Sequence, residues 1–294
     1  MPRVKANGIE IEFDTFGNRT SRPLLLIMGV GRQLVSWNED FCQRLADNDL
    51  FVIRFDNRDV GLSTKFEGAG IPDLTNLLTA SIEEKKSKAP YSLEDMADDA
   101  VGLLDVLAIQ KAHICGASMG AAITQIIGYK HPSRVLSLIS IMGSTGNPGL
   151  PQAKPTAMEV LMAPVPEKRE DHLKSVLNRL RILWGSMTFD EADMQRRAEL
   201  EYDRAFYPQG MVRQMAAILA DGNRKPKLKS ITAPTLIIHG SEDPLVPWEG
   251  GKDTAEAIPG AKLLIIDRMG HGLPREAWPQ IIKAIFEHIQ KAAG

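Results

Sequence analysis

The segment Gly116-Ala117-Ser118-Met119-Gly120 places a serine between two glycines, with a short apolar run before it (112–115) and a helical pattern after it (121–130). A serine on such a strand-to-helix turn is held in a strained backbone conformation that exposes its hydroxyl. The glycines are needed because the neighbouring backbone must approach closely. We therefore interpret Ser118 as a nucleophile; the alternative is an ordinary turn serine.

A serine hydroxyl is a weak nucleophile at neutral pH and needs a base. His271 lies in the glycine-flanked segment 267–272, directly after the last apolar run, 262–266. Catalytic groups in open α/β sheets gather at the carboxyl ends of the strands, so His271 is the expected base. We expect the other histidines to have structural or surface roles. His113 lies in a strand, His131 at a helix end and His172 in a charged segment. His239 lies at a strand end from which it could support the site, and His288 is expected on the surface of the last helix.

The imidazole needs a carboxylate that holds its tautomer and stabilises its protonated form. Asp243 follows another apolar run, 235–239, and is the expected acid. Glu242 beside it is the alternative, and an Asp-Pro turn is the structural interpretation. The chain order Ser118, Asp243, His271 is the one associated with a Gly-x-Ser-x-Gly turn, and it predicts acyl transfer by attack of the serine on a carbonyl carbon.

Acyl transfer also needs backbone donors for the developing oxyanion. One is expected from the N–H of Met119, the residue after the nucleophile. The other is expected from the N–H of Val30, in the glycine-containing loop 28–31 that follows the apolar run 24–28. The sequence therefore predicts an oxyanion hole formed by these two backbone groups.

The elements that must position these residues alternate along the chain. Asn7-Gly8 is a hairpin-turn signal and predicts an antiparallel pairing of 3–6 with 9–15. Helices are predicted from Ser92 onwards, over 121–130 and over 278–291. The alternation of strands and helices predicts an α/β fold with a mostly parallel sheet and helices on both faces. Buried strands are expected at six short apolar runs: 24–28, 50–55, 112–115, 136–141, 235–239 and 262–266.

One stretch, 146–229, contains no convincing buried strand; it begins with prolines and continues with helical, methionine-rich and charged segments. We expect a helical cap (lid) insertion at 146–229 over a core domain formed by 1–145 and 230–294; ordinary crossover helices are the alternative. Apolar side chains near the serine and in the insertion are expected to bind substrate, although each could instead pack the cap against the sheet. They are Met28, Met158, Met162, Trp184, Met187 and Met215.

Composition and charge narrow the class of protein. The 294 residues carry 35 basic and 37 acidic side chains, a net charge of -2, which argues against a nucleic-acid partner. Two cysteines cannot build a disulfide framework. The longest apolar run, 24–30, is far shorter than the roughly 20 residues that span a bilayer, and no secretory signal is visible. We expect a soluble, cytoplasmic protein without a membrane partner.

These features resemble the α/β-hydrolase superfamily. Met28-Gly29 with the loop to Trp37, the segment 56–63 (Asp-Asn-Arg-Asp-Val-Gly-Leu-Ser) and the segment 116–120 look like the branch that contains aclacinomycin methylesterase and related carboxylesterases. The resemblance implies an eight-stranded sheet, a helical cap and hydrolysis with no metal and no organic cofactor. Two departures stand out: many relatives have His-Gly where this chain has Met28-Gly29, and many have glycine where Asp59 stands. We interpret 56–63 as a structural loop.

The predicted function is a carboxylesterase-type serine hydrolase that acts on a small to medium hydrophobic ester through a triad of Ser118, His271 and Asp243 and an acyl-enzyme. The alternatives are a C–C bond hydrolase or a perhydrolase with the same triad, a slow-turnover small-molecule receptor of the same fold, and an interaction protein whose serine is unreactive. The expected partner is a small-molecule ester; whether the chain forms a homodimer stays open.

Overall fold

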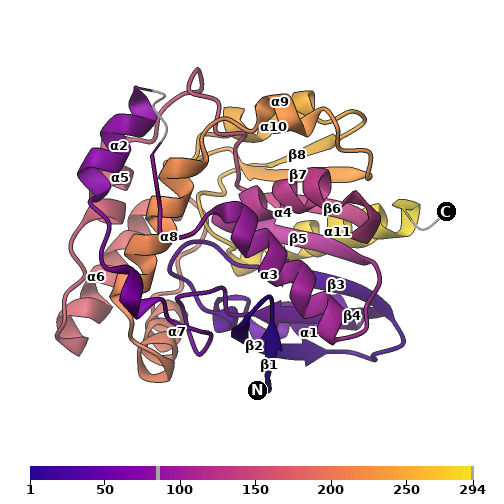
Figure 1. Ribbon diagram of the computed structural model, residues 1–294, viewed down its shortest axis with the longest axis horizontal. Coiled ribbons are helices and arrows are strands. Elements are labelled where there is room, and N and C mark those ends of the chain that lie inside the picture. Colours follow the sequence, from indigo (N-terminus) through magenta and orange to yellow (C-terminus); the bar gives the residue numbers. More distant parts are fainter. Residues whose placement is uncertain (84–86, 293–294) are drawn as a thin grey trace.

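The computed structural model describes residues 1–83 and 87–292. Its centre is an eight-stranded sheet with the order β1-β2-β4-β3-β5-β6-β7-β8. The pairings β1–β2 and β2–β4 are antiparallel and the others are parallel. Helices cover both faces of the sheet (Figure 1). The structure therefore confirms the mostly parallel α/β architecture expected from the sequence.

The bounds of the elements are as follows. The strands are β1 Arg3–Ala6, β2 Ile9–Phe16, β3 Arg22–Ile27, β4 Leu50–Phe55, β5 Ala112–Ala117, β6 Val135–Ile141, β7 Thr235–Gly240 and β8 Lys262–Ile266. The α-helices are α1 Glu39–Ala46, α2 Leu74–Ile82, α3 Leu93–Val106, α4 Met119–Lys130, α5 Pro155–Met162, α6 Arg169–Leu183, α7 Glu191–Arg204, α8 Pro208–Asp221, α9 Lys225–Leu228, α10 Glu249–Ala257 and α11 Trp278–Ala292. Short 3-10 turns lie at Leu34–Ser36, Glu67–Ala69, Pro132–Arg134 and Arg275–Ala277.

The first two strands form the predicted hairpin. Ala6 pairs with Ile9, and the two residues between them have positive φ, 48° at Asn7 and 81° at Gly8. Two consecutive positive φ values define the turn whose twist matches that of the flanking strands. The Asn-Gly pair therefore fixes where the hairpin turns.

The central strands are apolar on both sides because helices pack on both faces of the sheet. In β3, Leu25 and Ile27 belong to the apolar cluster that includes residues of α3 and α4. Leu24 and Leu26, which point the other way, belong to the cluster that includes residues of α1 and α11. This double burial explains why the strands appear in the sequence as continuous apolar runs.

The residues around the first turn explain where helices α3 and α4 begin. Ser92 caps α3: its hydroxyl accepts from the backbone N–H of Asp95, whose carboxylate accepts from the backbone N–H of Ser92. Helix α4 begins at Met119, two residues earlier than the apolar pattern indicates, because it starts directly after the turn at Ser118.

The assignment of His288 to the protein surface was wrong. Its side chain is buried, and burial lowers its pKa. Ile281, Ile285 and Ile289 form the apolar face of α11, and His288 follows Ile281 by seven residues. Residues at this spacing share one face of a helix, so His288 faces the sheet with the isoleucines.

The segment between β6 and β7 is helical and lies beside one end of the sheet (Figure 1). Its helices α6 and α7 share a small apolar cluster of Leu173, Val176 and Ala198. Helix α2, which the sequence did not predict, packs against α8. No helix in the described ranges has both the length and the apolar character needed to cross a membrane.

Candidate active site

The turn between β5 and α4 holds Ser118 in the conformation expected of an exposed nucleophile. Ser118 has φ 56° and ψ -118°, which is unusual for a residue with a side chain. A Cβ atom on Gly116 would lie 2.0 Å from the carbonyl oxygen of Gly120, and one on Gly120 would lie 2.1 Å from the carbonyl oxygen of Ile27. Both glycines are therefore required by close backbone contacts.

Three side chains that are far apart in the sequence form one hydrogen-bonded chain. Ser118 Oγ lies 2.9 Å from Nε2 of His271, and Nδ1 of the same imidazole lies 2.7 Å from Oδ2 of Asp243. Ser118 follows β5, Asp243 follows β7 and His271 follows β8, so all three lie at the carboxyl ends of parallel strands. This geometry allows the imidazole to accept the hydroxyl proton while the carboxylate holds its other nitrogen.

The carboxylate of Asp243 is buried and fully hydrogen-bonded. Its Oδ1 accepts from the backbone N–H groups of Leu245, at 2.9 Å, and Val246, at 2.8 Å. Burial alone would raise the pKa of Asp243, but the charge and hydrogen bond of His271, together with His239, hold it far below its usual range. Asp243 is therefore ionised across the neutral pH range.

His239 supports this carboxylate from the side. Its Nε2 lies 2.8 Å from the backbone oxygen of Val246 and 3.4 Å from Oδ2 of Asp243. The alternative acid, Glu242, lies elsewhere: its Oε2 accepts from the backbone N–H of Ser186 at 2.8 Å. The structure thus places Asp243, and not Glu242, against His271.

The predicted oxyanion donors lie on either side of the serine. A Cβ atom on Gly29 would lie 3.1 Å from Cβ of Ser118, so the loop after β3 runs directly against the nucleophile. Asn57 holds this loop through the carbonyl oxygen of Met28, at 3.0 Å. The N–H groups of Val30 and Met119 donate to no acceptor within the described ranges, which leaves both available to a ligand.

A pocket opens above Ser118 and His271, and its lining is largely apolar. The apolar side chains come from the loops after the strands and from the helices between β6 and β7: Met28, Val30, Ala117, Met142, Leu161, Val176, Leu180, Leu183, Trp184, Met194, Met211, Leu245 and Leu273. Of the six predicted substrate-binding residues, Met28 and Trp184 line this pocket.

The other four predicted pocket residues do not line it. Met187 packs in the apolar cluster between the sheet and α11, and Met215 is buried on α8. Met158 and Met162 lie on α5, which contributes Leu161 to the pocket instead. The sequence did not separate them from the lining residues, because the mixed apolar pattern of the helices between β6 and β7 does not reveal which side faces the serine.

Sequence reasoning missed three arginines in the pocket wall, Arg32, Arg179 and Arg197. Arg179 and Arg197 lie in charged stretches that are typical of solvated helix faces, and Arg32 lies in the loop after β3, so composition gave no signal for them. The pocket is therefore largely apolar, with three arginines in its wall.

The loop 56–63 joins helix α8, in the segment between β6 and β7, to the rest of the fold. Asp59 has φ 71°, a left-handed conformation that favours glycine. Its buried carboxylate forms an ion pair with Arg213 of α8, with Nε 2.8 Å from Oδ2, and accepts from the hydroxyl of Tyr91 at 2.7 Å. These contacts explain why the chain accepts an aspartate where a glycine would be less strained, and they agree with a structural role for the loop.

Within the described ranges, no group of three or more His, Cys, Asp or Glu side chains is arranged to hold a metal ion. Burial raises the pKa of Cys115, behind the nucleophile turn, well above its ordinary value, so this thiol stays protonated.

Comparison with known proteins gives a consistent result. A family model described as alpha/beta hydrolase fold matches residues 22–274. Rhodomycin D methylesterase DnrP of Streptomyces peucetius is 30% identical over 298 residues, with 94% of this chain and 93% of that protein covered. A 2-hydroxy-6-oxononadienedioate/2-hydroxy-6-oxononatrienedioate hydrolase of Paraburkholderia xenovorans is 32% identical over 192 residues, with 65% of this chain and 62% of that protein covered.

Among solved structures, a thermophilic esterase from Thermogutta terrifontis superposes with a TM-score of 0.76 at 22% identity and covers 99% of both chains. This likeness concerns the fold. The methylesterase match confirms the resemblance to that branch which the sequence motifs indicated.

Proposed function

The chain belongs to the alpha/beta hydrolase family, and from that premise we propose that it is a carboxylic ester hydrolase with Ser118 as nucleophile, His271 as base and Asp243 as orienting acid. The observation that carries the proposal is the hydrogen-bonded chain from Ser118 Oγ through the imidazole to the buried carboxylate. The match to methylesterases over 94% of the chain supports an ester as the substrate.

The first half of the reaction forms an acyl-enzyme. Ser118 Oγ attacks the ester carbonyl carbon while its proton passes to Nε2 of His271. The carbonyl oxygen becomes an oxyanion that the N–H groups of Val30 and Met119 stabilise. When the tetrahedral intermediate collapses, the carbon–oxygen bond to the alcohol breaks and Nε2 returns the proton to that alcohol.

The second half releases the acid. Water gives a proton to Nε2 of His271 and attacks the acyl carbon, and the proton then returns to Ser118 Oγ as the acid leaves. Asp243 stays ionised throughout and stabilises the imidazolium each time it forms. Each group acts twice, so no external acid, base or metal is needed.

The lining of the pocket favours a small to medium apolar ester. Met28 and Trp184 reach the pocket from different elements, one from the loop after β3 and one from the end of α6. We propose that the segment 146–229 acts as a cap that covers the reacting carbonyl and excludes water from it. Predominantly apolar walls with a few polar groups are typical of small-molecule sites.

A panel of simple esters tests this function. Wild-type protein should hydrolyse esters of increasing acyl length, and Ser118→Ala and His271→Ala should each lower kcat by at least about 10³-fold. The matched control is His131→Gln, at a helix end away from the pocket. If Ser118→Ala protein with unchanged circular dichroism keeps most of the wild-type activity, Ser118 is not the nucleophile.

Hydrolysis of a C–C bond is the second candidate because several relatives are named 2-hydroxy-6-oxononadienedioate/2-hydroxy-6-oxononatrienedioate hydrolases. That reaction adds water across a carbon–carbon bond next to a ketone, and the same triad could support it. A vinylogous diketone tested beside the esters separates the two: the ester hydrolase should cleave the esters at a higher kcat/KM.

A further inference from the structure

Arg179 of α6 lies in the wall of the site and pairs with no carboxylate of the residues that the structure describes. Its Nη1 lies 3.8 Å from the sulfur of Met211, and its Nε is shielded from solvent with no hydrogen-bond partner among those residues. Arg179 is only partly exposed, and a guanidinium that has lost part of its hydration without gaining a counter-charge is costly. Such a group is stabilised when a ligand supplies the missing acceptor.

The other two arginines of the pocket show the contrast. Arg32 lies 2.7 Å from Oε1 of Glu201 and also donates to Ser36 Oγ at 3.1 Å. Arg197 forms an ion pair with Asp193, at 2.7 Å. Arg179 alone among the three pairs with no carboxylate of the described ranges, so one positive charge in the wall is unbalanced.

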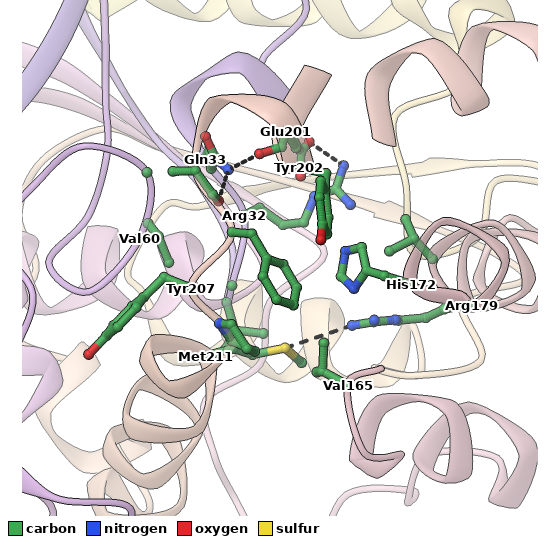
Figure 2. Close-up of a pocket in the computed structure, with 17 residues that line it drawn as sticks. Arg32, Gln33, Val60, Val165, His172, Arg179, Glu201, Tyr202, Tyr207 and Met211 are labelled. Atoms are coloured by element: carbon green, nitrogen blue, oxygen red, sulfur yellow. Dashed lines mark hydrogen bonds and ion pairs between the residues drawn. The ribbon is translucent and has the colours of Figure 1, made fainter. Parts of the chain in front are cut away.

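Arg179 stands where two cavities meet. It lines the pocket above Ser118 and also an adjoining cavity between the loop 30–33 and helices α6, α7 and α8. Val30, Arg32, Val176, Arg179 and Met211 line both cavities. Figure 2 shows the adjoining cavity, with Arg179 and His172 directed into it. A ligand that extends from the serine along the cap wall would therefore meet the guanidinium.

His172 gives a second sign of a missing polar ligand at this place. Its Nδ1 is shielded and has no partner within the described ranges. Burial, followed by the charges of Arg179 and Arg32, lowers the pKa of His172, so the ring is neutral near pH 7 and can donate one hydrogen bond. Burial and the neighbouring Arg32 also lower the pKa of Arg179, and only Glu201 acts against them. An anionic ligand would supply the counter-charge that Arg179 lacks and could accept a hydrogen bond from His172.

We propose that the substrate carries an anionic group, of the carboxylate class, that binds Arg179 at the cap end of the pocket while its ester carbonyl lies at Ser118. The inference rests on the proposed ester hydrolase function and deepens it. Planar carboxylates suit a guanidinium because two parallel N–H···O bonds can form. The preferred substrates are then half-esters of dicarboxylic acids, with an apolar spacer against the methionine and leucine side chains.

The test compares monomethyl esters of straight-chain dicarboxylic acids with the matching dimethyl esters, over a series of spacer lengths. Wild-type protein should show a higher kcat/KM for the monoester at an optimum length. In Arg179→Met the ratio of monoester to diester kcat/KM should fall about 30- to 100-fold, and Arg179→Lys should recover part of it. Arg181→Met is the matched control, because Arg181 lies on the same helix and pairs with Glu191 at the surface.

A binding measurement separates this inference from the function on which it rests. In Ser118→Ala protein, calorimetry should detect the monoester at its best length, and the added Arg179→Met change should weaken its Kd by a similar factor. If no ester is turned over but this binding difference is found, the esterase proposal fails and the anion site stands. Equal loss of both esters in Arg179→Met, or equal binding with and without Arg179, would overturn the anion site.

Discussion

Two regions of the site differ in how their polar side chains are paired. The rim is the carboxyl edge of the sheet with Ser118, Asp243 and His271, and the cap wall is the side of α6 and α7 that lines the pocket. At the rim, the polar atoms of Ser118, Asp243 and His271 all have partners, and two backbone N–H groups fix the carboxylate. In the cap wall, Nε of Arg179, Nδ1 of His172 and Nε of Arg197 are shielded without partners in the described ranges. The reacting side chains of the rim are paired with one another without a ligand, whereas the side chains of the wall are not.

This difference separates two tasks. The reacting groups extend from the ends of parallel strands, whose register keeps them in place before any substrate arrives. Arg179 and His172, which would choose a substrate, lie on α6, in the helical segment that Asp59 and Arg213 join to the rest of the fold. Changes at the rim should therefore affect catalysis, whereas changes in the wall should affect which substrate is chosen.

The largest expected effect is a loss of kcat when the carboxylate of the rim is changed. Asp243→Asn should lower kcat about 10³- to 10⁴-fold, because an amide holds the imidazole in the wrong tautomer and cannot stabilise its charge. Glu242→Gln is the matched control, since that neighbouring carboxylate contacts Ser186 rather than His271. Steady-state kinetics on one ester measures both variants, and comparable losses in the two would contradict the assignment of Asp243.

The next largest effect is a loss of stability when the ion pair between Asp59 and Arg213 is broken. Arg213→Met leaves the buried carboxylate of Asp59 without its counter-charge, and breaking such a pair costs about 3–5 kcal/mol of unfolding free energy. Urea denaturation measures this loss. Arg181→Met removes an exposed ion pair on the same cap and should change little. A stability of Arg213→Met equal to that of wild type would show that the cap is not held by this pair.

The smallest expected effect is a pH dependence of stability that comes from His113, which is buried in β5. Burial lowers the pKa of His113 from 6.5 to about 4 in the folded protein. Between pH 6.5 and about 4, His113 binds a proton in the unfolded chain but not in the folded one. The free energy of unfolding therefore falls as the pH drops from about 6.5 to about 4. The slope from this group is at most about 1.4 kcal/mol per pH unit.

His113→Gln should flatten this slope in urea titrations between pH 4 and 6.5. His172→Gln on α6 should flatten it less, because His172 is partly exposed whereas His113 is buried. An unchanged slope in His113→Gln would mean that the imidazole is protonated in the folded protein.

The sequence predicted most of the rim and little of the wall, for physical reasons. Strands β3 to β7 are buried on both faces, so their apolar runs mark them within two residues of the observed ends. The run 262–266 was expected as a buried strand, but β8 lies at the edge of the sheet and only Ile266 in it is buried. Gly116 and Gly120 are forced by backbone contacts, and such local requirements are visible in sequence. Asp243 and His271 could be found because each follows a strand whose carboxyl end is the functional end.

The wall could not be predicted in the same way. Helices α6 and α7 are charged over most of their surface and share only three buried residues of a cluster, so their inward side has no clear periodic signal. Met158, Met162, Met187 and Met215 were chosen by residue type and missed the pocket. Arg179 looks like any exposed arginine until the tertiary structure places it between two cavities.

The most direct test of the account is covalent labelling with a fluorophosphonate, followed by peptide mapping. The probe reacts with a serine only when a base activates its hydroxyl and an oxyanion hole receives the phosphoryl oxygen. The account predicts one adduct, on Ser118, that disappears in Ser118→Ala and forms far more slowly in His271→Ala and Asp243→Asn. An unlabelled Ser118 in folded wild-type protein, or an adduct that persists on another residue in Ser118→Ala, would contradict it.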